Sequence, residues 1–249
     1  MPTEQRFVAD YDNTLQSYLE LLPPMVADID TAVIAFHGHG SHQEQFMTPS
    51  IYDDAFTPVM QLLCERNIVY IAPEYRGNSW MNAAAVSDCR QIICSLRAAY
   101  GVKHIVLIGG SMGGTSVLIY AALHPEGISG VLAACPATDM AELYDELQGS
   151  RWDAIAQTIA AQYGGIPELN PAEYSRRSSR RHVENLKMPI SIIHGNSDAL
   201  ISVNHSRIMV QRLRELGSPV IYREITDGDH DAPVQFFAEE LAALLDRIA

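Results

Sequence analysis

The segment at 109–114 carries a serine in a glycine-rich turn that suits nucleophilic chemistry. Its sequence, Gly-Gly-Ser-Met-Gly-Gly, follows an apolar, β-branched run at 105–108 and precedes a helix-like segment at 115–123. A strand, a tight Gly-x-Ser-x-Gly turn and a helix are what a nucleophile elbow requires. Gly109 and Gly113 leave room where the strand and the helix nearly touch. The sequence thus predicts that Ser111 can attack an ester or amide carbonyl; the alternative is a turn whose serine is incidental.

A nucleophilic serine also needs a base to take its proton and an acid to orient that base. In this architecture the partners follow the serine in the order acid, then histidine, and both lie in loops after strands. A strand predicted at 188–193 leads to Asp198, and one at 220–225 leads to His230. Order and loop position therefore predict a triad of Ser111, Asp198 and His230.

The acid has one rival and one alternative role. Asp139 also follows a predicted strand, at 128–134, but Asp198 lies in a Gly-x-x-Asp turn next to the expected strand. Asp198 could instead only cap a helix that begins near residue 203, although Ser202 fits that role better. We therefore expect Asp198 to be the acid.

Three other histidines compete with His230 for the role of the base. His194 ends a strand and is expected to pack there, His205 falls inside a predicted helix, and His182 lies in a polar stretch. Only His230 combines a loop position, a nearby preceding glycine and a late place in the chain. His230 is therefore the predicted base.

Acyl transfer also needs hydrogen-bond donors for the oxyanion that forms on the attacked carbonyl. The backbone N–H of Met112, directly after the serine, is one predicted donor. The second is expected from the N–H of His39, in the glycine-rich loop after a strand at 31–36. The spacing His37-x-His39, with His42 nearby, could suggest a metal, but no acidic residue completes a ligand set. We therefore expect no metal.

Apolar strands alternate with amphipathic helices along the chain. Strands are predicted at 31–36, 68–72, 104–108, 128–134, 188–194 and 220–225, and helices at 83–100, 112–123, 203–216 and 232–248. Continuous apolar strands separated by helices indicate an α/β fold with a mostly parallel central sheet covered on both faces. Residues 6–10 and 15–22 are expected to open the chain as an antiparallel pair.

Residues 138–187 interrupt this alternation, because they are too long for a simple crossover between two strands. They contain a predicted helix at 151–163 and then an irregular return with Arg176, Arg177, Arg180 and Arg181. We interpret the segment as a small cap insertion within a single domain spanning 1–249. The arginines are expected to form a solvated face with local ion pairs; binding of an acidic substrate is the alternative. An apolar substrate pocket lined by Tyr75, Trp80 and Trp152, with Met81, is expected; the alternative is that these side chains only pack in the core.

Composition argues against two classes of partner. The chain has 249 residues, 47% of them hydrophobic, and a net charge of −13. The charge disfavours nucleic acid and anionic membrane surfaces as partners. The start has no signal-peptide pattern, and no apolar run is long enough to span a bilayer. The cysteines (Cys64, Cys89, Cys94 and Cys135) form no Cys-x-x-Cys pair and are expected to be buried free thiols in a cytoplasmic protein.

As a set, these motifs resemble those of α/β-hydrolases. The resemblance rests on His37-Gly38, the Pro-Glu-Tyr-Arg-Gly run at 73–77, the serine turn, the His-Gly-Asn-Ser-Asp run at 194–198 and Gly-Asp-His at 228–230. It spans nearly the whole chain and is closest to the catalytic domain of the prolyl-oligopeptidase-like peptidases and esterases. The resemblance implies the α/β-hydrolase fold and a Ser–Asp–His hydrolase that uses no metal or cofactor.

The substrate class is less defined than the reaction. A bounded pocket under a cap favours hydrolysis of small or medium carboxylic esters through an acyl-enzyme. The alternative is a peptidase-like amide hydrolase, with Glu74 or Asp139 as an anchor for a peptide amine. The chain has no room for the N-terminal propeller of oligopeptidases, which favours the esterase. A binding protein that keeps the fold is a third hypothesis, and the sequence leaves the oligomeric state open.

Overall fold

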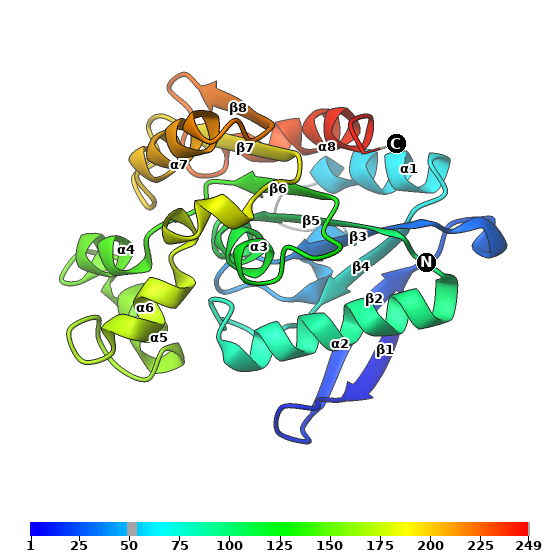
Figure 1. Ribbon diagram of the computed structural model, residues 1–249, viewed down its shortest axis with the longest axis horizontal. Helices are drawn as coiled ribbons and strands as arrows, with labels where there is room; N and C mark the ends of the chain where they lie inside the picture. Colours follow the sequence, from blue (N-terminus) through cyan, green and yellow to red (C-terminus); the bar gives the residue numbers. More distant parts are fainter. Residues whose placement is uncertain (49–53, 249) are drawn as a thin grey trace.

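The structure is a computed structural model that describes residues 1–48 and 54–248. Its strands form an eight-stranded sheet in the order β1-β2-β4-β3-β5-β6-β7-β8 (Figure 1). They are β1 (Thr3–Val8), β2 (Leu15–Leu21), β3 (Thr31–Phe36), β4 (Val69–Pro73), β5 (His104–Gly110), β6 (Gly130–Ala134), β7 (Ile190–Gly195) and β8 (Val220–Ile225). Six neighbouring strands, β4, β3, β5, β6, β7 and β8, pair in parallel. The other two are antiparallel: β1 pairs with β2, and β2 pairs with β4. The predicted mostly parallel sheet and its antiparallel opening are confirmed.

Helices cover both faces of this sheet. They are α1 (Thr57–Glu65), α2 (Ala83–Tyr100), α3 (Met112–Leu123), α4 (Met140–Leu147), α5 (Asp153–Gln162), α6 (Pro171–Arg177), α7 (Asn204–Glu215) and α8 (Phe237–Leu245). Buried side chains of α2, α3 and α7 join the core on one face, and those of α1 and α8 join the core on the other. Within β3, Ile34 belongs to the first core and Val33 to the second, because successive side chains point to opposite faces.

The predicted elements agree with the structure except at four places. No element was predicted at α1 or α4, and an irregular return was predicted where α6 lies. The predicted helix at 232–248 is wrong in detail, because a 3-10 helix at Ala232–Phe236 precedes α8. Pro233 lies in the first turn of that 3-10 helix, where N–H groups have no acceptor within the helix and proline is tolerated.

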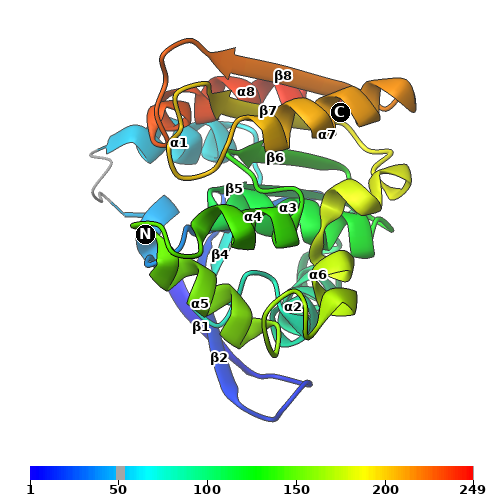
Figure 2. The same ribbon diagram turned by 90° about the vertical axis from the view of Figure 1, so that its left-hand side faces the viewer.

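The segment between β6 and β7 contains α4, α5 and α6, followed by the 3-10 helices Ser179–Arg181 and Val183–Asn185. Figure 2 shows α4, α5 and α6 together in the foreground, beside the sheet rather than within it. The hydroxyl of Tyr163, just after α5, donates to the carbonyl oxygen of Trp80 at 2.6 Å. This buried contact ties the helical segment to the loop that follows β4.

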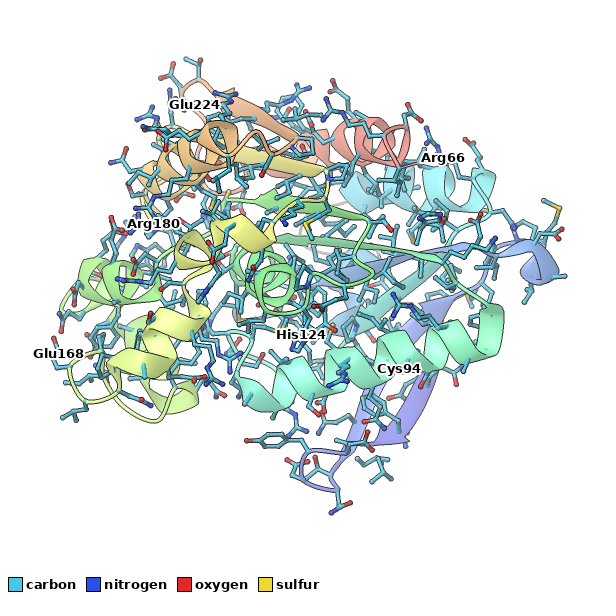
Figure 3. All side chains as sticks on the ribbon, in the orientation of Figure 1. Arg66, Cys94, His124, Glu168, Arg180 and Glu224 are labelled. Carbon is cyan, nitrogen blue, oxygen red and sulfur yellow. The ribbon has the colours of Figure 1, made fainter. Side chains whose placement is uncertain are left out.

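The four cysteines do not all lie where the sequence predicted. Cys89 and Cys135 are buried, but Cys64 and Cys94 are exposed, and all four are free thiols. Figure 3 shows Cys94 on α2. The expectation was wrong for these two because each occupies an apolar helix but faces away from the sheet. Among the helices that the structure describes, none is long and apolar enough to cross a membrane.

Candidate active site

Ser111 lies in a strained turn between β5 and α3. Its backbone has φ 58° and ψ −122°, a left-handed conformation that a serine rarely adopts. The turn is held by two bonds: the Ser111 N–H donates to the Ala134 carbonyl at 2.9 Å, and the Thr115 hydroxyl donates to the Ser111 carbonyl at 3.0 Å. The strain therefore persists because β6 and α3 fix the turn from both sides.

The glycines around Ser111 explain how the helix can approach the sheet so closely. A Cβ atom on Gly113 would lie 1.9 Å from the carbonyl oxygen of Phe36 in β3. A Cβ on Gly109 would lie 2.5 Å from the backbone of Gly113, and one on Gly114 would lie 2.4 Å from the Ala134 oxygen. All three contacts are with backbone, which cannot move aside easily. The predicted role of Gly109 and Gly113 in leaving space is thus met at both positions.

Replacing Gly113 by alanine is expected to lower the free energy of unfolding by about 3 kcal/mol, because the new methyl group must displace β3 or α3. Gly110→Ala is the matched control, since its Cβ would meet nothing closer than 3.8 Å. Urea denaturation of both variants measures the effect. Equal stabilities for the two variants would contradict the close approach.

His230 lies between Ser111 and Asp198. Its Nε2 is 2.9 Å from Ser111 Oγ, and its Nδ1 is 2.6 Å from Asp198 Oδ2. Because the carboxylate can only accept, Nδ1 carries the proton and Nε2 can accept the proton of the serine hydroxyl. The structure thus brings together the three side chains that the sequence predicted, in the geometry that activates a serine nucleophile.

Two loops that follow β7 and β8 place Asp198 and His230 side by side. The Ser197 N–H donates to the Gly228 carbonyl at 2.9 Å, and the Asp227 N–H donates to the Asn196 side chain at 2.8 Å. A Cβ on Gly195 would lie only 2.2 Å from the Gly228 oxygen, so a glycine is required for the loops to touch. The acid and the base are therefore positioned by the same loop contact.

The side chain of Asp198 is fully buried, yet it is held in the charged form. Burial alone would raise its pKa, but contacts with His194 and His230 and the N–H of Ile201 outweigh burial and hold the pKa of Asp198 well below its usual range. Asp198 Oδ1 also accepts from the N–H groups of Leu200 and Ile201. Asp198 therefore holds both His230 and its own turn, but it does not cap α7, where the Asn204 N–H instead meets the Ser202 hydroxyl at 3.3 Å.

The loop that carries His39 faces the serine. Gly38 lies beside Ser111, because a Cβ on Gly38 would be 3.8 Å from the Ser111 Cβ. The N–H of Gly38 donates to Gln45 at 2.7 Å, and that of Gly40 donates to Asn78 at 2.7 Å. No acceptor for the N–H of His39 is found among residues 1–48 and 54–248.

Met112 carries the other backbone N–H that was expected to stabilise the oxyanion. It is the first residue of α3, and the first N–H groups of a helix have no acceptor within the helix. The backbone N–H groups of Met112 and His39 are therefore both available to a developing oxyanion.

Ser111 and His230 open into a cavity of about 730 Å³. Its wall includes apolar side chains from several parts of the chain, among them Phe46, Phe56, Trp152, Ile155, Leu200, Pro233, Val234 and Phe237. Trp152 and Ile155 belong to the segment between β6 and β7. Glu44 and Asp231 are the acidic side chains among the described lining residues. The cavity can hold an apolar group next to the serine.

Of the three aromatic residues expected to line this cavity, the structure places only Trp152 there. Tyr75 is buried beneath the His39 loop, and its hydroxyl donates to the His37 carbonyl at 2.6 Å. Trp80 is 1% exposed, with its ring 5.9 Å from the His39 ring. Both have left-handed backbones, at φ 27° and 48°. The expectation was wrong for Tyr75 and Trp80, which support the loop from behind.

Asp139, the rival acid, and Glu74, the other expected anchor for a peptide amine, both have structural roles. Asp139 caps α4 by accepting from the N–H groups of Ala141 and Glu142, and it pairs with Arg180 at 2.9 Å. Glu74 accepts from the N–H of Gln43 at 3.0 Å. Neither Asp139 nor Glu74 is among the described residues that line the cavity, so neither faces a substrate there.

The arginine run is only partly the solvated face that the sequence predicted. Local ion pairs are present, with Arg177 bound to Glu173 at 2.7 Å and Arg180 bound to both Asp139 and Glu142. However, Arg177 is 2% exposed, so it belongs to the packed interior. Figure 3 shows Arg180 at the junction of α4 with the body of the protein. These arginines hold the helical segment together.

Two of the histidines that compete with His230 are occupied away from Ser111 and Asp198. His205 is buried in α7, where Nδ1 accepts from the Thr138 N–H and Nε2 lies 3.3 Å from Glu146. His182 bonds the Ser175 carbonyl. Both ring nitrogens of His37 face carbonyl oxygens, those of Gly38 and Glu74. His37 is therefore not oriented to bind a metal together with His39.

Two other groups have ligand atoms close enough for a metal within the described part of the chain. One consists of Cys135 with Asp198 and His230, and the other of Glu142 with Glu146 and His205. In the first group the Asp198–His230 hydrogen bond already uses the facing atoms, and in the second Arg180 neutralises Glu142. Both arrangements are explained without an ion.

Sequence reasoning missed the residues that support the site. Gln45 and Asn78 fix the His39 loop, and Cys135 packs beneath His230, with Sγ 3.1 Å from its carbonyl oxygen. Cys135 was expected only to be a buried free thiol. Gln45 and Asn78 gave no signal, because their partners are backbone groups of a loop that the sequence cannot place.

Comparisons with known proteins agree with this fold. Residues 54–246 match the model of the prolyl oligopeptidase family. The chain is 28% identical over 163 residues to the uncharacterized peptidase YtmA of Bacillus subtilis, covering 62% of each chain. It is 26% identical over 195 residues to the probable carboxylic ester hydrolase LipM of Mycobacterium tuberculosis, covering 70% of this chain and 44% of LipM. The chain thus spans less than two thirds of the length of the curated relatives it matches.

A solved structure shows the same fold over the whole chain. FphF, a fluorophosphonate-binding serine hydrolase of Staphylococcus aureus, superimposes with a TM-score of 0.73 at 13% identity, covering 100% of this chain and 98% of FphF. The predicted α/β-hydrolase fold is confirmed. Because the family model covers most of the residues, including those of the predicted triad, the chain belongs to the prolyl oligopeptidase family.

Proposed function

We propose that this protein is a serine hydrolase that cleaves carboxylic esters of small or medium substrates through an acyl-enzyme. The observation that carries the proposal is the hydrogen-bonded chain from Asp198 through His230 to Ser111, which opens into an apolar cavity. Membership of the prolyl oligopeptidase family supports hydrolysis as the reaction class.

In the first step, Ser111 Oγ attacks the ester carbonyl carbon while its proton passes to His230 Nε2. The charge on the imidazolium is stabilised by Asp198, which is already ionised and in contact with Nδ1. The N–H groups of Met112 and His39 stabilise the oxyanion, and such a donor is worth roughly 3–4 kcal/mol. The C–O bond to the alcohol then breaks, and His230 gives its proton to the leaving alcohol.

Water then completes the reaction. His230 Nε2 takes a proton from water as the oxygen attacks the acyl carbon, and the same two N–H groups bind the second oxyanion. The bond to Ser111 Oγ breaks, and His230 returns the proton to the serine. The acid leaves and the free enzyme is restored, so the cycle needs neither a metal nor a cofactor.

The segment 138–187 serves, in this proposal, as a cap that limits substrate size. Two of its side chains, Trp152 and Ile155, form part of the cavity wall. The cavity volume of about 730 Å³ suits a small or medium ester rather than a folded protein.

Amide hydrolysis is the second candidate, because the family description and the name of YtmA both refer to peptidases. Asp139 and Glu74, the expected anchors for a peptide amine, are absent from the described cavity lining. The acidic lining residues Glu44 and Asp231 would have to take that role. Esters need no such anchor, so the apolar wall favours them.

A matched substrate series distinguishes the two candidates. We expect kcat/KM for p-nitrophenyl esters, from acetate to decanoate, to exceed that for p-nitroanilides of the same acyl groups, with an optimum at a chain length that fills the cavity. Aminoacyl p-nitroanilides test the peptidase. Faster cleavage of aminoacyl anilides than of every ester would contradict the ester proposal and support the amide hydrolase.

A further inference from the structure

We propose that His194 is a positioning residue that holds the carboxylate of Asp198 in place for proton transfer through His230. The inference rests on the proposed serine chemistry and extends it to a fourth side chain. His194 lies in β7 and is fully buried, and its Nε2 is 3.2 Å from Asp198 Oδ2. His230 Nδ1 is 2.6 Å from the same oxygen. Two imidazole rings therefore share one oxygen of the acid.

The contacts of His194 show which nitrogen carries its proton. Nε2 also lies 3.0 Å from the carbonyl oxygen of Ile201, and both this oxygen and the carboxylate are acceptors. Nε2 must therefore be a donor. At the other side of the ring, Nδ1 is 2.7 Å from the Ser206 hydroxyl of α7. The ring is thus held between β7 and α7, with its Nε2–H bonded to the Ile201 carbonyl and also within 3.2 Å of Asp198 Oδ2.

His194 differs from the other donors to Asp198 in where it comes from. Oδ1 accepts from Leu200 and Ile201, which are in the same loop as Asp198 itself. His194 reaches Oδ2 from the rigid centre of the sheet. A buried carboxylate with fixed donors on both oxygens cannot rotate, so Oδ2 stays directed at His230.

No lysine or arginine in the described part of the chain pairs with Asp198. Glu224 lies opposite His194 in the register of β7 and β8, and it is paired with Arg207 of α7. Figure 3 shows Glu224 on β8. Cys135 lies next to Asp198, and Asp231 adjoins His230. Within the described residues, the imidazole rings that contact the Asp198 carboxylate are those of His194 and His230.

Two substitutions separate a donor from a mere space filler. In His194→Gln the side-chain amide nitrogen can reach the position of Nε2, whereas in His194→Asn it reaches only that of Nδ1. His205→Asn is the matched control, because His205 is equally buried but contacts Thr138 and Glu146 instead. Thermal unfolding of all three variants records the cost in stability.

The reactivity of Ser111 is then measured with an alkyl fluorophosphonate across pH 5 to 9, which needs no knowledge of the natural substrate. In this reaction the Ser111 Oγ–P bond forms, the P–F bond breaks, fluoride leaves and the proton passes to His230. We expect the Asn variant to react about 10- to 100-fold more slowly, the range that corresponds to losing a hydrogen bond to a charged group. The pH at half-maximal rate should also rise, because Oδ2 then interacts with His230 alone.

The Gln variant and His205→Asn should keep both the rate and the pH profile of the unmodified protein. Equal losses in the Gln and Asn variants, or an Asn variant with unchanged rate and profile, would overturn the role of His194. If the unmodified protein does not react, the proposed function fails separately. The nuclear magnetic resonance signal of the His230 Nδ1 proton then decides the role of His194. A shift in the Asn variant alone supports it, and an unchanged signal in that variant overturns it.

Discussion

Replacing Ser111 by alanine is expected to lower kcat/KM for p-nitrophenyl esters about 10⁶-fold while leaving the protein folded. In the proposed mechanism this variant removes the atom that forms the covalent bond to substrate, and it keeps the backbone contacts of the turn to Ala134 and Thr115. Steady-state rates and mass spectrometry of the phosphonylated protein measure the loss.

A second serine provides the control for this substitution. Ser41 lines the same cavity, so Ser41→Ala removes a hydroxyl from the site without removing the one bonded to His230. We expect Ser41→Ala to keep most of the activity. If Ser111→Ala were still active, or if Ser41→Ala were the inactive variant, Ser111 would not be the nucleophile.

The sequence could predict the positions of Ser111, Asp198 and His230 because each lies in a loop directly after a strand. The carboxyl ends of neighbouring parallel strands meet at one edge of a sheet, so three such loops must converge. The same reasoning placed the His39 loop, which follows β3. In each case local pattern and chain order were sufficient, because the parallel topology does the rest.

The sequence failed where a side chain's direction depends on backbone turns or on distant partners. Tyr75 and Trp80 adjoin the expected site, but their left-handed backbones direct the rings under the loop. Arg180 meets Asp139 and Glu142, which are about forty residues away in the chain, so its ion pairs could not be inferred from neighbours. His194 was expected only to pack, because nothing in the sequence shows that its ring and that of His230 reach the same oxygen.

Replacing Asp198 by asparagine is expected to lower kcat about 10⁴-fold, the second largest effect. The reason lies in the two ends of the side chain. Oδ1 accepts from the N–H groups of Leu200 and Ile201, so the amide oxygen of the variant must take this place. The amide NH₂ then faces His230 Nδ1 as a donor. Nδ1 becomes the acceptor, Nε2 carries the proton, and His230 can no longer take the proton of Ser111.

Asp139→Asn is the matched control, since Asp139 was the rival acid in the sequence. Its side chain caps α4 and pairs with Arg180, and an amide oxygen can still cap the helix. We expect this variant to lose some stability and little activity. A large loss of kcat in Asp139→Asn with an active Asp198→Asn would reverse the assignment of the acid.

The stability of the Asp198 variant should also depend on pH in a defined direction. The pKa of Asp198 is depressed in the folded protein: burial opposes this, but the contacts with His194 and His230 outweigh it. A depressed carboxyl pKa contributes stability above the unfolded value of about 3.9, and that contribution is lost as pH falls through the folded value. The difference in unfolding free energy between the unmodified protein and Asp198→Asn should therefore be largest near neutral pH and shrink below about pH 4. Urea denaturation of both proteins between pH 3 and pH 7 measures this difference in unfolding free energy. A difference that grows as the pH falls would show that Asp198 is not held as a carboxylate by these histidines.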